Sequence, residues 1–148
     1  MTVENKQAGL QGYAGDVTVL QAWTLLKDNP DSILVDVRTN AEWAFVGQPD
    51  LSSLNKQVIP ISWVLFPNMS PNENFISDLK NHHSNQNAPI LFLCRSGVRS
   101  IAAAISATHA GYEQCYNVLA GFEGDLDPNR HRGNASGWKN ENLAWVQG

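Results

Sequence analysis

The sequence predicts an α/β domain whose sheet is mainly parallel and carries helices on both faces. Short apolar runs, rich in β-branched residues, alternate along the chain with segments of helical periodicity. The runs are apolar almost without interruption, as in strands that are covered on both sides. The 148 residues, 43% of them apolar, are enough for one domain with a substantial core.

Charge and composition argue against several classes of protein. A net charge of −4 disfavours a nucleic-acid binder, which needs clustered basic residues to neutralise phosphates. The stretch Met1–Gly15 lacks the basic and apolar regions of a secretory signal, and the apolar stretch Val58–Phe66 falls short of the roughly 20 residues that span a membrane. Two cysteines do not form a disulfide framework. We therefore expect a cytoplasmic protein without membrane association, a setting in which a cysteine is more often reactive than structural.

The first half of the chain contains two predicted helices and two predicted strands. Apolar residues three and four positions apart predict the first helix, which Thr18 or Asp16 caps and the pair Asn29-Pro30 ends. Pro60 lies near the start of the second strand, where it cannot donate a hydrogen bond to a neighbour. In chain order we predict a helix over 19–26, a strand over 33–37, a short helix over 40–46, a loop over 47–55 and a strand over 58–65.

The second half contains the clearest strand and the clearest helix of the sequence. We predict a helix over 72–83, a polar loop over 81–89, a strand over 90–94, a helix from 98 to near Gly111, and a strand over 115–119. The apolar face of the last helix is expected to contain Val98, Ile101, Ala102 and Ile105. Beyond Gly121 the pattern dissolves, and we expect Trp138 and Trp145 to hold the C-terminal segment against the body; the alternative is that they cover the candidate site.

The segment that joins the clearest strand to the clearest helix is the candidate site. It consists of Cys94, Arg95, Ser96, Gly97, Val98, Arg99 and Ser100. In parallel sheets, ligands bind beyond the carboxyl ends of the strands, where Cys94 lies. Backbone N–H groups converge in such a loop, Gly97 permits the backbone angles that it needs, and Arg95 and Arg99 add positive charge. We expect a thiol that ionises more readily than a free cysteine, in a loop that binds anions.

Other polar residues receive more local interpretations. Asp36 and Arg38 follow the strand over 33–37 and are either a strand-end carboxylate and a surface base, or a pair that braces the Cys94 loop; we favour bracing. Glu42 is expected to cap its helix or to pair locally. Cys115 is expected to be a buried thiol, with a resolving role opposite Cys94 as the alternative. No Cys or His stands at zinc spacing, so we expect no metal site.

These motifs together resemble the rhodanese family of sulfurtransferases. The segment Cys94–Ser100 is similar to the active-site loop of that family, and Asp36-Val37-Arg38 followed by Glu42-Trp43 resembles its D-x-R and E-[FYW] signature. The stretches 111–112 and 117–122 match the segment after the active-site helix, whereas residues 58–62 depart from the usual G-H-I-P-G-A stretch. The tail resembles that of short single-domain bacterial members. The resemblance implies a five-stranded sheet, with an extension over 1–15, a rhodanese-like domain over 16–127 and a tail over 128–148 packed on the domain.

The resemblance also implies a reaction. Cys94 would take a sulfur atom from a small anionic donor such as thiosulfate and pass it, as a persulfide, to cyanide, a thiol or a protein acceptor. The N–H groups from Arg95 to Ser100 would stabilise the persulfide, Arg95 and Arg99 would neutralise the donor, and no metal or organic cofactor would be needed. The alternatives are a persulfide carrier or protein-interaction module and a catalytically silent domain. A cysteine phosphatase is disfavoured because four residues, not five, separate Cys94 from Arg99.

Overall fold

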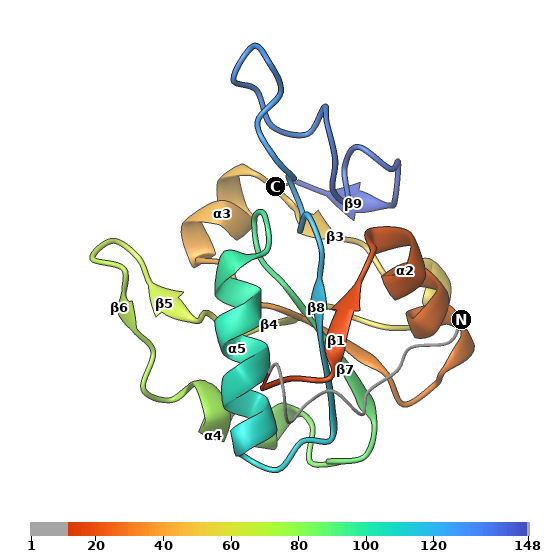
Figure 1. Ribbon diagram of the computed structural model, residues 1–148, viewed down its shortest axis with the longest axis vertical. Helices are drawn as coiled ribbons and strands as arrows, with labels where there is room; N and C mark the ends of the chain where they lie inside the picture. The colour runs from red at the N-terminus through yellow and green to blue at the C-terminus, as the bar shows by residue number, and fades with distance from the viewer. Residues whose placement is uncertain (1–11, 148) are drawn as a thin grey trace.

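A five-stranded sheet forms the centre of the computed structural model, which describes residues 12–147 (Figure 1). Its strands are β1 (Gly15–Val17), β2 (Ile33–Asp36), β4 (Ile59–Pro60), β7 (Pro89–Leu93) and β8 (Gln114–Val118). They lie in the order β1-β8-β7-β2-β4, and every neighbouring pair is parallel. The predicted α/β class and the five-stranded parallel sheet are therefore confirmed.

Four α-helices lie within the described residues, together with a short 3-10 turn. They are α2 (Val19–Asp28), α3 (Asn40–Phe45), α4 (Phe75–His82) and α5 (Val98–His109), and the turn is η1 (Ser52–Leu54). Thr18 caps α2 and Thr39 caps α3, and in both cases the side chain three residues later returns a hydrogen-bond acceptor to the cap. Of the two caps predicted for the first helix, Thr18 is therefore the correct one.

Helices cover both faces of the sheet, as predicted. On one face α4 and α5 pack against alternate side chains of the central strand, among them Phe92, and against Cys94 directly after it. On the other face α2 and Trp138 pack against Leu91 and Leu93. Because side chains alternate along a strand, the position of Cys94 in the chain directs it toward the face that carries α5.

The strand predicted over 58–65 is wrong as a single element. Only Ile59–Pro60 joins the central sheet, as its edge strand β4, where the missing N–H of a proline is tolerated. The following residues form a separate antiparallel pair between β5 (Val64–Leu65) and β6 (Ser70–Pro71). The loop predicted over 47–55 also contains a short strand, β3 (Gln48–Pro49).

The expected apolar face of α5 is wrong at its first position. Val98 is 78% exposed, whereas the buried residues of the helix are Ser100, Ala103, Ala104 and Ala107. Small side chains let the helix backbone approach the sheet closely, and the larger Ile101 and Ile105 are partly buried beside them. The hydrophobic pattern therefore predicted the position of the helix correctly, but it assigned Val98 to the buried face, which in the structure consists of smaller residues further along the helix.

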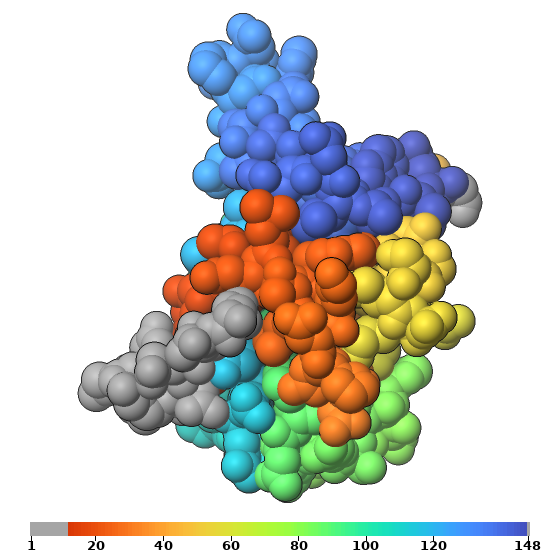
Figure 2. All heavy atoms as spheres, turned by 90° about the vertical axis from the view of Figure 1, so that its right-hand side faces the viewer, coloured from red at the N-terminus to blue at the C-terminus, as the bar shows by residue number. Residues whose placement is uncertain are grey.

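The C-terminal segment lies against the body, as expected from its tryptophans. Strand β9 (Trp145–Val146) pairs with β3 in antiparallel fashion, and Trp138 is 0% exposed with its ring 5.9 Å from that of Trp23 on α2. The Trp138 indole N–H donates to the carbonyl of Ala144 at 2.9 Å. Figure 2 shows this segment, in dark blue, lying across α2 and the region that follows α3.

Residues 1–11 of the N-terminal extension predicted over 1–15 lie outside the described residues. From residue 12 onward the chain joins the body, because Tyr13 and Ala14 are buried and β1 pairs with β8. Within residues 12–147, none of the helices has the length and apolarity that crossing a membrane requires.

We expect Trp138→Ala to lower the free energy of unfolding by about 3–5 kcal/mol, because it would leave a cavity the size of an indole ring between α2 and the sheet. Trp145→Ala is the matched control in the same segment: its side chain is 38% exposed, so the loss should be clearly smaller. Urea denaturation followed by circular dichroism measures both. Equal losses would contradict the buried position of Trp138.

Candidate active site

The segment Cys94–Gly97 connects β7 to α5 at the carboxyl edge of the sheet, as predicted (Figure 1). The turn after β8 holds it in place. The N–H of Phe122 donates to the Cys94 carbonyl at 2.8 Å, and the next two N–H groups donate to the Arg95 carbonyl. A Cβ at Gly121, which has a φ of +60°, would overlap the Cys94 carbonyl, so this close approach requires glycine.

The Cys94 side chain is buried, at 1% exposure. Its Sγ accepts a hydrogen bond from the Gly97 N–H at 3.1 Å and lies 3.2 Å from Ser100 Oγ. The sequence predicted that several N–H groups of the loop converge, but among residues 12–147 a single backbone N–H, that of Gly97, donates to Sγ. The N–H groups of residues 95, 96 and 98–100 have no acceptor within the part of the chain that the structure describes, and so remain available to a bound anion.

A chain of polar groups continues from Cys94 away from the loop, from the buried Ser100 and Asn117 to the exposed Asp16. The Ser100 hydroxyl donates to Asn117 Oδ1 at 2.5 Å, and Asn117 Nδ2 donates to Asp16 Oδ1 at 3.0 Å. The Tyr13 hydroxyl donates to the same carboxylate oxygen at 2.9 Å. The sequence placed Ser100 in the Cys94 loop but did not connect Asn117, Asp16 or Tyr13 to it. The available signal was Asn117, a polar side chain in a strand that is otherwise buried.

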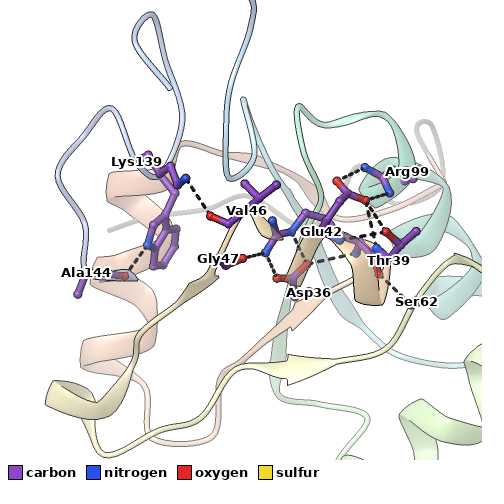
Figure 3. A network of polar contacts seen from close by, with 11 residues as sticks. Asp36, Thr39, Glu42, Val46, Gly47, Ser62, Arg99, Lys139 and Ala144 are labelled. Atoms are coloured by element: carbon purple, nitrogen blue, oxygen red, sulfur yellow. Dashed lines mark hydrogen bonds and ion pairs between the residues drawn. The ribbon is translucent and has the colours of Figure 1, made fainter. Parts of the chain in front are cut away.

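The Arg99 guanidinium is paired with a carboxylate. It donates two hydrogen bonds to Glu42, at 2.7 and 3.0 Å, and the two side chains are 19% and 18% exposed (Figure 3). Burial alone would raise the pKa of the Glu42 carboxyl, but the hydrogen bonds and charge of Arg99 and the Thr39 N–H outweigh burial and lower it. The local cap expected of Glu42 is present, whereas its pairing with Arg99 was not predicted.

An open pocket of about 340 Å³ lies beside this ion pair. It is lined by Glu42, Val46, Met69, Arg95, Arg99 and Glu123. Arg95 is exposed, so its charge is presented to solvent. The two arginines of the loop therefore differ: Glu42 neutralises Arg99, and Arg95 is the one whose charge faces an incoming ligand.

Asp36 and Arg38 form a fully buried ion pair next to the loop (Figure 3). The guanidinium donates to the two carboxylate oxygens at 2.9 and 2.6 Å and to the Gly47 carbonyl at 2.7 Å. Its Cζ lies 4.3 Å from the centroid of the Phe122 ring. The Phe122 N–H donates to the Cys94 carbonyl. Phe122 therefore connects the ion pair, on which its ring packs, to the Cys94 loop, which its N–H holds.

Phe122 also contacts the C-terminal segment. The Lys139 ammonium lies 5.3 Å from the centroid of the Phe122 ring and 3.9 Å from that of Trp145. It also donates to the Val46 carbonyl at 3.0 Å (Figure 3). Burial lowers the pKa of this ammonium group. The C-terminal segment therefore supports the turn that holds the Cys94 loop.

Cys115 lies in the core, at 0% exposure. Burial raises the pKa of its thiol to about 11, although a hydrogen bond with Thr108 opposes the shift. A thiol that is both buried and protonated is a poor nucleophile. These properties distinguish it from Cys94, whose Sγ meets two polar groups of the loop and helix.

The fold and the site define a rhodanese-like single domain. A family model described as the STR4 middle domain matches residues 14–148, and the chain belongs to this rhodanese-like family. An uncharacterized protein of Rickettsia conorii is 43% identical over 125 residues, which are 84% of this chain and 91% of that protein. The thiosulfate sulfurtransferase GlpE of Haemophilus influenzae is 26% identical over 109 residues, 74% of this chain and 85% of that protein.

Two solved structures resemble the chain over most of its length. The crystal structure of Rv0390 from M. tuberculosis has 52% sequence identity and a TM-score of 0.85, and the match covers 92% of this chain and 99% of that one. The polysulfide-sulfur transferase homodimer of Wolinella succinogenes has 20% identity and a TM-score of 0.63, covering 96% of this chain and 85% of that one. At that identity, the second likeness concerns the fold alone.

We expect Glu42→Gln to lower the free energy of unfolding by about 1 kcal/mol near neutral pH, because it breaks a partly buried ion pair. The pKa of Glu42 is lowered in the folded protein, whereas a glutamate in the unfolded chain has a pKa of about 4.3. The stabilisation is therefore present above that value and is lost as the pH falls through the lower, folded value.

Urea denaturation at several pH values measures this difference. The exposed Glu73→Gln is the matched control, since it changes the net charge equally. If the free energy of unfolding differed between the protein and Glu42→Gln by the same amount in acid as near neutral pH, the role of the ion pair would be contradicted.

Proposed function

We propose that the protein is a sulfurtransferase that moves a sulfane sulfur from a small anionic donor, such as thiosulfate, to cyanide or a thiol through a persulfide on Cys94. One observation supports this proposal above the others. Cys94 Sγ lies at the start of a loop in which the N–H groups of residues 95, 96 and 98–100 have no acceptor among residues 12–147. Such groups at a helix N-terminus stabilise negative charge.

In the first step the Cys94 thiolate attacks the outer sulfur of thiosulfate. An S–S bond forms between Cys94 and that sulfur, the S–S bond of thiosulfate breaks, and sulfite leaves with the electron pair. In the second step cyanide attacks the outer sulfur of the persulfide. A C–S bond forms, the S–S bond to Cys94 breaks, the electron pair goes to the Cys94 sulfur, and thiocyanate is released as the thiolate is restored. Negative charge stays on sulfur throughout, so the loop's N–H groups act at the place where charge develops.

The arginines have unequal parts in this proposal. Arg99 is engaged by Glu42, so its contribution to binding the donor's charge is small, and it serves mainly to position the start of α5 against α3. Arg95 is exposed and lines the pocket, and it attracts the anionic donor. Asp36 and Arg38 act indirectly, by holding the ring of Phe122 against which the loop is anchored.

Incubation with thiosulfate and cyanide should yield thiocyanate, and Cys94→Ser should reduce its formation to the uncatalysed rate because the nucleophile is lost. Cys115→Ala is the matched control and should retain most of the activity, since the Cys115 thiol is buried and protonated. Equal activity in the protein and in Cys94→Ser would refute the proposal. Negligible thiocyanate together with one added sulfur on Cys94, seen by mass spectrometry, would indicate a persulfide carrier instead.

We expect Arg95→Ala to raise KM for thiosulfate roughly twofold to fivefold while kcat changes little, because an exposed charge assists the approach of an anion and does not take part in bond changes. The effect should shrink at high ionic strength. Lys80→Ala, an exposed change on α4, is the control and should leave KM unaltered. An unchanged KM for Arg95→Ala would remove this residue from donor binding.

A further inference from the structure

The hydrogen bonds that lead from Cys94 through Ser100 and Asn117 to Asp16 have a fixed donor–acceptor order, and the Asp16 carboxylate determines it. A carboxylate can only accept hydrogen bonds, so Asp16 orients the Asn117 amide with its Nδ2 toward β1. Asn117 Oδ1 must then face Ser100, and it accepts the Ser100 hydroxyl hydrogen at 2.5 Å. With that hydrogen engaged, Ser100 Oγ presents only lone pairs to Cys94 Sγ, 3.2 Å away.

We propose that Asn117, oriented by Asp16, is a positioning residue that keeps the Ser100 hydroxyl from donating to Cys94 and thereby sets the pH at which this thiol ionises. In this arrangement the neutral thiol is favoured on the Ser100 side, because its S–H has an acceptor there. The Gly97 N–H favours the thiolate on the other side. A second donor reaches the Cys94 thiolate only when the Ser100 hydroxyl leaves Asn117, whose buried oxygen then loses its donor.

The chain orients groups and does not conduct protons. An amide between a hydroxyl and a carboxylate cannot pass a proton along without changing its own bonding, so Asp16 is not the base that removes the Cys94 proton. In this inference Asp16 acts on Cys94 through the orientation of Asn117. Tyr13 helps to hold the carboxylate, and burial with the Asp16 hydrogen bond raises the pKa of the Tyr13 hydroxyl to about 12, so it remains a donor at ordinary pH.

Other charged groups also lie near Cys94. They are Arg95 in the loop, Arg99 on α5, the Asp36–Arg38 pair at the end of β2, and Glu42 on α3. Asp36 with Arg38, and Glu42 with Arg99, are ion pairs whose charges largely cancel. None of these residues contacts Asn117 or Asp16 among the hydrogen bonds of residues 12–147, so changes at Asp16 leave their arrangement intact.

The test uses the full chain and the ultraviolet absorbance of the thiolate, followed against pH and corrected with Cys94→Ser. Asp16→Asn is nearly isosteric and exposed, and its amide can donate to Asn117. Asn117 is then free to turn, and Ser100 can donate to the thiolate. We expect the midpoint of the absorbance change to fall by about one pH unit. Tyr13→Phe keeps the carboxylate and should leave the midpoint nearly unchanged.

A second background separates orientation from simple charge. Removing the negative charge of Asp16 would by itself favour a thiolate at any site nearby, and this effect would persist without Ser100. In Ser100→Ala, therefore, Asp16→Asn should produce no further shift if the effect passes through the hydroxyl. Equal shifts in the two backgrounds, or no shift on Asp16→Asn alone, would overturn the inference.

Only the relevance of this inference to catalysis rests on the proposed function, since the ionisation of Cys94 is measured without any substrate. If the protein also forms thiocyanate, the acid limb of its pH profile should move with the absorbance midpoint in Asp16→Asn. An absorbance shift in a protein without turnover would refute the sulfurtransferase and leave the positioning role of Asn117 standing. Turnover whose acid limb stays in place despite the absorbance shift would show that this role does not extend to the reaction.

Discussion

The buried ion pair between Asp36 and Arg38 is the constraint on which the carboxyl edge of the sheet depends. Both side chains are 0% exposed, and an unpaired charge in that position would cost about 3–5 kcal/mol. The guanidinium therefore stays where it satisfies the carboxylate and the Gly47 carbonyl together. Phe122 packs on its face, and the N–H of Phe122 holds the carbonyl of Cys94. One electrostatic requirement thus links the end of β2, the segment after α3 and the loop of the candidate nucleophile.

Neutral dipoles dominate the immediate surroundings of Cys94. Arg99, which the sequence places five residues further on, is engaged by Glu42 on α3, so the loop does not carry two free cations. What remains near the sulfur to stabilise negative charge is the Gly97 N–H and the start of α5, since the Ser100 hydroxyl donates to Asn117. Fixed dipoles of this kind need no counterion and little reorganisation when negative charge develops, which suits a proposed reaction in which charge stays on sulfur.

The local hydrophobic pattern was sufficient to predict the longer helices and strands, but it was insufficient to predict the short strands. β7 (Pro89–Leu93) and α5 (Val98–His109) are among the longest elements, and their runs of apolar residues are typical of a buried strand and a helix. β3 and β9 have two residues each and exist only because Gln48–Pro49 and Trp145–Val146 meet across about two thirds of the chain. With three residues, β1 is nearly as short, and β4 ends at a proline, so neither is long enough to show an alternating pattern.

The sequence by itself determined the α/β architecture, the place of Cys94 at the carboxyl end of a central strand, and the residues of the loop that follows it. Each of these depends on neighbours in the chain, through periodicity, helix capping and strand length. Only the tertiary structure decided which charges cancel and which polar groups reach the sulfur. Glu42 meets Arg99 across 57 residues, and Asp16 meets Asn117 across 101. Contacts over such separations arise from the packing of whole elements, and no local spacing encodes them.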